Sequence, residues 1–171
     1  RSVYAIGDLV NGPSFTHTAS YHAGIVLKKI LFGLSSTMQT IHIPQVTYTD
    51  PEIASVGLNF NDAVKRFGNK VERSCVNLES NDRAITDNKT EGFVEVVLLG
   101  RKVIGCTIVS KNGGELISFW AFIISRNLKI SNVNSMVPPY PTLGEVNKRA
   151  VSEYYGPKPV SYTHLRAHET P

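Results

Sequence analysis

Cysteine is scarce in this sequence: its 171 residues include two, Cys75 and Cys106. They lie far apart, and neither belongs to a Cys-x-x-Cys motif or a cluster with histidine, so nothing indicates a zinc site. Each stands in an apolar run, and we expect both thiols to be buried and inert. We also expect no metal site from the five histidines, which are His17, His22, His42, His164 and His168.

Long apolar runs and strong charge are absent as well. No stretch approaches the roughly 20 apolar residues of a membrane-spanning helix, and no signal peptide is recognisable. The net charge of +4 is small and scattered, without the basic run that marks a nucleic-acid surface. We therefore expect a cytoplasmic protein with no nucleic-acid partner and no membrane association. The first residue is Arg1, which is consistent with a truncated chain.

The order of the expected elements predicts an α+β fold. Strands are grouped in the middle of the chain and helices flank them, which favours an antiparallel sheet. Thr142 and Glu145 have the spacing of a capping box at the start of the last helix. The expected helices are 19–31 (beginning near 16–18), 59–67, 115–128, a turn at 131–136, and 143–154; the expected strands are 45–48, 53–58, 70–78, a short extension at 83–86, and a hairpin of 92–99 with 102–109.

The stretch Val3–His17 has the pattern of a strand, a loop and a helix start. The apolar run ends at Gly7-Asp8, and the next helix opens near Thr16. Such a turn places a carboxylate at the end of the strand and directs free backbone N–H groups toward whatever lies before the helix. In α/β sheets this is where cofactors bind. From the pattern alone, an ordinary buried strand that ends in a Gly-Asp turn is an equally good interpretation.

This stretch resembles the second flavin-binding motif of the class I pyridine nucleotide-disulfide oxidoreductases, the family of dihydrolipoamide dehydrogenase, glutathione reductase and mercuric reductase. The matching residues are Ala5-Ile6-Gly7-Asp8, Gly12-Pro13 and Thr16-His17. The resemblance continues through VTYTDPEIASVGL, NDRAITDNKTEGFVEVV, IGCTIV, GELI and PYPTLGEVNKRA, as far as about residue 150. It implies that this chain is the C-terminal third of such an enzyme.

The resemblance also implies an FAD site. The aspartate that matches Asp8 holds the ribityl chain of the flavin, for which an ionised carboxylate is well suited. Gly7 belongs to the same turn, and the backbone at Thr16 and His17 would face the pyrimidine end of the flavin, where the helix dipole stabilises negative charge. We expect cofactor binding by Gly7, Asp8, Thr16 and His17. A turn-capping role for Asp8 and simple packing of His17 are the alternatives.

A second implied site lies at Tyr140-Pro141-Thr142 and Glu145. In dihydrolipoamide dehydrogenase and glutathione reductase, the position of Tyr140 is a histidine that a glutamate orients for proton transfer. A tyrosine with a pKa near 10 is a poor base at neutral pH, but it can donate a hydrogen bond or help to bind a soft metal ion. Mercuric reductase also has tyrosine here. We expect Tyr140 and Glu145 to be catalytic; the alternative is that Tyr140 packs and Glu145 only caps its helix.

The expected domains are residues 1–34, the last strand and helix of an FAD-binding domain, and 43–157, the interface domain of a homodimer. The apolar helix with Phe119, Trp120 and Phe122 would offer hydrophobic surface for dimerisation. Residues 158–171 look like a non-native, adaptor-like tail.

The resemblance implies a parent enzyme that passes electrons from NAD(P)H through FAD and a cysteine pair to a metal ion or disulfide, most like mercuric reductase. Dihydrolipoamide dehydrogenase is the alternative enzyme. The chain itself has no G-x-G-x-x-G motif and no C-x-x-x-x-C pair, so alone it would be a non-catalytic dimerisation module.

Overall fold

The computed structural model describes residues 3–34 and 37–156. Its helices are α1 (Thr16–Phe32), α2 (Phe60–Phe67), α3 (Asp82–Thr86), α4 (Gly113–Ser125), α5 (Ile130–Val133) and α6 (Glu145–Tyr155), with short 3-10 turns η1 (Gly7–Leu9), η2 (Gly68–Lys70) and η3 (Leu78–Ser80). Its strands are β1 (Gln45–Thr47), β2 (Glu52–Gly57), β3 (Val71–Asn77), β4 (Phe93–Leu99) and β5 (Lys102–Ser110).

The five strands form one antiparallel sheet in the order β1-β2-β5-β4-β3. β4 and β5 form the predicted hairpin, and its tight turn places Gly100 and Arg101 at positive φ. β2 then pairs with the free edge of β5, so the two apolar strands of the hairpin lie at the centre of the sheet. The predicted α+β fold with an antiparallel sheet is confirmed.

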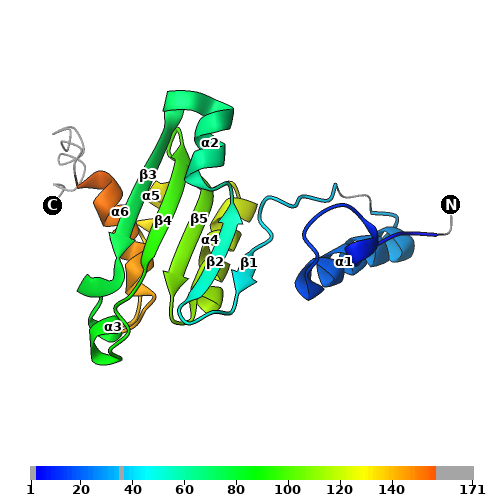
Figure 1. The fold of residues 1–171 in the computed structure, drawn as a ribbon. Helices are drawn as coiled ribbons and strands as arrows, with labels where there is room; N and C mark the ends of the chain where they lie inside the picture. Colours follow the sequence, from blue (N-terminus) through cyan, green and yellow to red (C-terminus); the bar gives the residue numbers. More distant parts are fainter. Residues whose placement is uncertain (1–2, 35–36, 157–171) are drawn as a thin grey trace, which may run out of the picture.

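Helices cover one face of this sheet, and the hydrophobic core lies between the two layers (Figure 1). α4 packs on β2 and β5, while α6 packs on β3 and β4. The residues of β4 that alternate toward the helices, among them Val94 and Val96, are fully buried. The indole of Trp120 lies in this core and is also fully buried. Trp120 therefore adds no surface for dimerisation, contrary to the sequence expectation, and Phe122 is the aromatic residue of α4 that remains 60% exposed.

The N-terminal segment stands apart from the sheet (Figure 1). It consists of η1 and α1, and α1 ends at Gly33, whose φ of 66° gives the left-handed conformation that glycine favours at helix ends. The expected strand before Gly7 is wrong: residues 3–6 form no regular element. A strand needs a hydrogen-bonded neighbour, and none of the strands in the described ranges lies beside these residues.

Three further expectations differ from the structure. The short extension at 83–86 is the helix α3, because the side chain of Asn81 caps it by accepting a hydrogen bond from the backbone N–H of Ala84. The last helix begins at Glu145, not at 143. Cys75 is exposed and only Cys106 is buried, because alternate residues of β3 face opposite sides of the sheet and Ser74 takes the side that faces α6.

No helix within the described residues has both the length and the apolar character needed to cross a membrane. The predicted tail at 158–171 lies outside the described residues.

Candidate functional site

The turn at Gly7-Asp8 is held against the first turns of α1. Gly7 has a φ of 63°, and a Cβ atom at this position would lie 3.1 Å from the Cβ of Ala19. Both its conformation and its close approach to α1 therefore favour glycine. The backbone N–H of Gly7 also donates a 3.2 Å hydrogen bond to Nδ1 of His22, a buried side chain whose role the sequence pattern did not predict.

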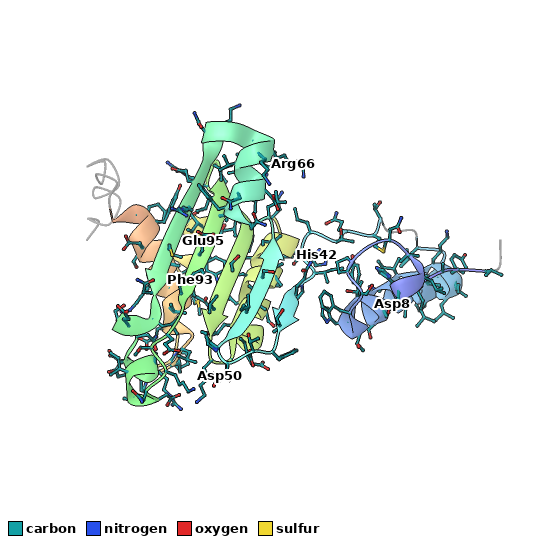
Figure 2. All side chains as sticks on the ribbon, viewed as in Figure 1. Asp8, His42, Asp50, Arg66, Phe93 and Glu95 are labelled. Atoms are coloured by element: carbon teal, nitrogen blue, oxygen red, sulfur yellow. The ribbon has the colours of Figure 1, made fainter. Side chains whose placement is uncertain are left out.

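A pocket opens between this turn and the start of α1. Asp8 is an exposed residue that lines this pocket, in the N-terminal segment away from the sheet (Figure 2). Its carboxylate makes no hydrogen bond to the described residues. α1 begins after Phe15, which provides no side-chain cap, so the first N–H groups of the helix are not capped by that residue. The structure thus brings three of the four predicted cofactor residues to one pocket, whose lining consists of Ile6, Gly7, Asp8, Leu9, Ser14, Phe15, Thr16 and Ala19.

The side chain of His17 is directed elsewhere. Its Nε2 lies 2.8 Å from the backbone oxygen of Pro44, and its ring stacks on Phe15 with the ring centroids 5.1 Å apart. His17 does not line the pocket. It links the start of α1 to the segment that leads into β1, a structural role that favours the packing interpretation for its side chain.

Tyr140 is 72% exposed, in the extended segment that precedes α6. Its phenol oxygen donates a 2.9 Å hydrogen bond to Oδ2 of Asp82, the first residue of α3. This hydrogen bond and the negative charge of Asp82 raise the pKa of Tyr140 above its usual value, with a smaller contribution in the same direction from Glu145. At neutral pH the phenol is therefore protonated, and its proton is engaged by Asp82.

Glu145 caps α6. Its Oε2 accepts a 3.3 Å hydrogen bond from the backbone N–H of Thr142, which is one half of the predicted capping box. The other half is missing, because the hydroxyl of Thr142 donates to the backbone oxygen of Pro139. Among the described residues, no hydrogen bond joins Glu145 to Tyr140, so the capping interpretation describes Glu145 in this structure.

Asn81 and Asp82 are the site residues that the sequence analysis missed. Asn81 is only 1% exposed, and its Nδ2 donates a 3.1 Å hydrogen bond to the backbone oxygen of Thr142. Two consecutive residues thus hold the two ends of the segment Tyr140–Thr142 from across the fold. The signal that could have revealed them is the pair Asn-Asp itself, since both residue types are favoured at the start of a helix.

The described residues contain no group of three or more histidine, cysteine, aspartate or glutamate side chains arranged to hold a metal ion. His17, His22 and His42 belong to no such group, and the expectation that the histidines form no metal site stays a prediction. The other two histidines, His164 and His168, lie outside the described residues.

Comparison with known proteins gives one family by sequence. Residues 43–151 match the family model described as "Pyridine nucleotide-disulphide oxidoreductase, dimerisation domain". A mercuric reductase from Lysinibacillus sphaericus is 33% identical over 88% of this chain and 28% of its own length. A dihydrolipoyl dehydrogenase from Geobacillus stearothermophilus is 32% identical over 91% of this chain and 33% of its own length.

Two solved structures have the same fold. LpdA from Mycobacterium tuberculosis matches with a TM-score of 0.81 at 22% identity, over 88% of this chain and 33% of that one. The Cu(II) complex of the flavoprotein disulfide reductase RclA from Escherichia coli matches with a TM-score of 0.79 at 20% identity, over 87% of this chain and 34% of that one. The chain thus spans about a third or less of the length of these relatives.

Proposed function

The chain belongs to the pyridine nucleotide-disulphide oxidoreductases, and we propose that it is the C-terminal part of an FAD-dependent NAD(P)H oxidoreductase of the mercuric reductase type. In this proposal, residues 1–34 end the FAD-binding domain and residues 43–157 form the interface domain of a cytoplasmic homodimer. The observation that carries the proposal is Tyr140, which takes the place of the histidine expected in an enzyme that reduces disulfides.

The pocket before α1 fits one end of a flavin. The free carboxylate of Asp8 can accept hydrogen bonds from hydroxyl groups of the ribityl chain. The N-terminus of α1 at Thr16 can face an electron-rich group, because the helix dipole is positive there. Gly7 allows the backbone to pass close to α1. When bound, FAD would supply the hydride chemistry, and these residues would orient it.

Tyr140 favours a metal-ion acceptor. A phenol with a raised pKa cannot serve as the general base that a thiol-disulfide reaction requires at neutral pH. Its oxygen still has lone pairs that can bind or position a cation. The electrons would come from NAD(P)H through FAD and a cysteine pair elsewhere in the enzyme, and the substrate would be a soft cation such as the mercuric ion.

Dihydrolipoamide dehydrogenase is the second candidate. It is supported by the 32% identity to the Geobacillus stearothermophilus enzyme over nearly the whole chain.

The two candidates predict different electron acceptors, so a comparison of acceptors separates them. The protein encoded by the complete reading frame is purified with FAD, and oxidation of NADH and of NADPH is followed with mercuric chloride, lipoamide or oxidised glutathione as the acceptor. Turnover with the mercuric ion alone supports the proposal, whereas turnover with lipoamide alone contradicts it.

The chain by itself is expected to act as a dimerisation module. In a two-fold contact the same surface serves both copies. Sedimentation of the 171-residue chain should show a dimer, and a monomer at about 100 micromolar, well above a micromolar dissociation constant, would contradict the homodimer. The isolated chain should bind FAD poorly and oxidise no NAD(P)H, and a stoichiometric yellow protein would contradict this.

A further inference from the structure

Tyr140 is held by a helix far away in the sequence. Oδ2 of Asp82 accepts a 2.9 Å hydrogen bond from the phenol hydroxyl, although the two residues are 58 positions apart in the chain. Beside it, the buried Asn81 caps α3 with its Oδ1 and binds the backbone oxygen of Thr142 with its Nδ2. Because Asn81 fixes α3 against the segment, the neighbouring carboxylate of Asp82 is kept within reach of the phenol.

The hydrogen bond determines what Tyr140 can offer to a substrate. A phenol has one proton to donate and also has lone pairs with which it can accept. With its proton directed at Asp82, the outer side of the oxygen presents lone pairs only. The charges that act on the phenol, those of Asp82 and Glu145, are both negative.

Two basic residues, Arg83 and Lys111, pair with Asp87 and not with Asp82. Arg83 forms an ion pair with Asp87 at 3.0 Å, and Lys111 binds the other oxygen of the same carboxylate at 3.3 Å. Asp82 itself is exposed and has Tyr140 as its side-chain partner among the described residues. The end of Tyr140 that faces solvent is therefore electron-rich and lies next to a carboxylate.

We propose that Asp82 is a positioning residue for Tyr140. Its carboxylate accepts the hydrogen bond of the phenol and so fixes the direction of the oxygen lone pairs, which favours a cationic acceptor over an anionic disulfide. The preference for a cationic acceptor rests on the proposed function, in which Tyr140 meets the acceptor. The positioning of Tyr140 by Asp82 concerns a contact within this chain and can be tested without any turnover.

The contact is tested by titrating Tyr140 in the 171-residue chain. NMR of protein labelled at the tyrosine Cζ carbon follows each phenol, and Tyr140→Phe identifies the resonance. In Asp82→Asn the pKa of Tyr140 should fall toward the ordinary value of about 10, and Asp82→Glu should restore part of the increase. Glu79→Gln is the matched control, since it removes one negative charge from the preceding turn and should leave the pKa of Tyr140 nearly unchanged.

If the pKa of Tyr140 is the same in the wild type and in Asp82→Asn, the hydrogen bond between Tyr140 and Asp82 is not formed in solution, and the proposal is wrong. A backbone NMR spectrum of each variant verifies that the fold is intact. If Asp82→Asn disturbs α3, Asp82→Ala provides a second variant without the charge, because Asp82 is the first residue inside α3 and alanine is a strong helix former.

The specificity is tested in the complete enzyme. Asp82→Asn should lower kcat/KM for mercuric chloride by about tenfold, because a neutral acceptor replaces the charged one, and should leave or raise kcat/KM for oxidised glutathione. Asp82→Glu should recover part of the loss. An equal loss for both acceptors would overturn the preference for cations. If the enzyme shows no turnover with the mercuric ion, the proposed function and the preference for cations are both wrong. The titration still tests whether Asp82 and Tyr140 form their hydrogen bond.

Discussion

Nε1 of Trp120 donates a 2.8 Å hydrogen bond to Oδ1 of Asn147, and both side chains are buried. Trp120 belongs to α4 and Asn147 to α6, so this bond joins the two helices that cover the sheet. A buried indole N–H without an acceptor is destabilising, because it loses its hydrogen bonds to water and forms none within the protein. The pair therefore fixes how α4 and α6 lie side by side, in a core that is otherwise mainly apolar.

Replacing Asn147 by alanine should lower the free energy of unfolding by about 2–3 kcal/mol, because it removes a buried hydrogen bond and leaves the indole N–H unsatisfied. Urea denaturation followed by tryptophan fluorescence measures this change. The control Asn61→Ala alters an exposed residue of α2 and should stay within about 0.5 kcal/mol of the wild type. Equal stability of the two variants would contradict a structural role for the Trp120–Asn147 bond.

The two asparagine caps should differ in their contribution to stability. Asn59 caps α2 at an exposed position by accepting a 2.9 Å hydrogen bond from the N–H of Asp62. Asn81 caps α3 and is buried, with a second bond to Thr142. Asn59→Ala should cost about 1 kcal/mol of unfolding free energy, and Asn81→Ala about 2–3 kcal/mol. Thermal unfolding that ranks the two variants the other way would show that the contact between α3 and the Tyr140 segment is not formed in solution.

The two cysteines should react very differently in the native chain. Burial raises the pKa of Cys106 well above its ordinary value, and both burial and the negative charge of Glu95 raise the pKa of Cys75. Since the thiolate is the reactive form, iodoacetamide should modify the exposed Cys75 slowly at neutral pH and faster as the pH rises above about 8. Cys106 should react only after unfolding.

Two variants test this expectation. Glu95→Gln should speed up the reaction of Cys75 at pH about 8, because removing the negative charge lowers the pKa of the thiol. Cys75→Ser should abolish modification of the native chain. Modification of both cysteines at one rate, observed by mass spectrometry, would mean that Cys106 is not buried.

Local patterns were enough to predict most of the fold. The apolar, β-branched runs of β4 and β5 indicate a central hairpin whatever lies around them, and Gly33 and Gly68 end their helices where the sequence predicts. The errors arise where a distant partner decides the structure. Residues 3–6 have the composition of a strand but no neighbouring strand in the described part of the chain, and α3 depends on the cap that Asn81 provides.

In the candidate site, too, local patterns could be predicted from the sequence and contacts between distant residues could not. The glycine and aspartate of the first turn could be identified from their order in the sequence, and they meet at the pocket before α1. The partner of Tyr140 could not be identified in this way, because Asp82 lies 58 residues away and no local pattern joins the two. Glu145, three residues from Thr142, was the nearer candidate in the sequence, yet it binds the backbone at the start of α6.

The most direct test of the proposed function is the rate of each half of the reaction in the complete enzyme with Tyr140→Phe. The change removes one hydroxyl and keeps the ring, so the fold should survive. Stopped-flow absorbance should show that NAD(P)H reduces the flavin at the wild-type rate. The mercuric-ion-dependent rate should fall by about one to two orders of magnitude, or roughly 1.4–2.8 kcal/mol. An unchanged mercuric-ion-dependent rate would mean that Tyr140 does not meet the acceptor, and would contradict the proposed function.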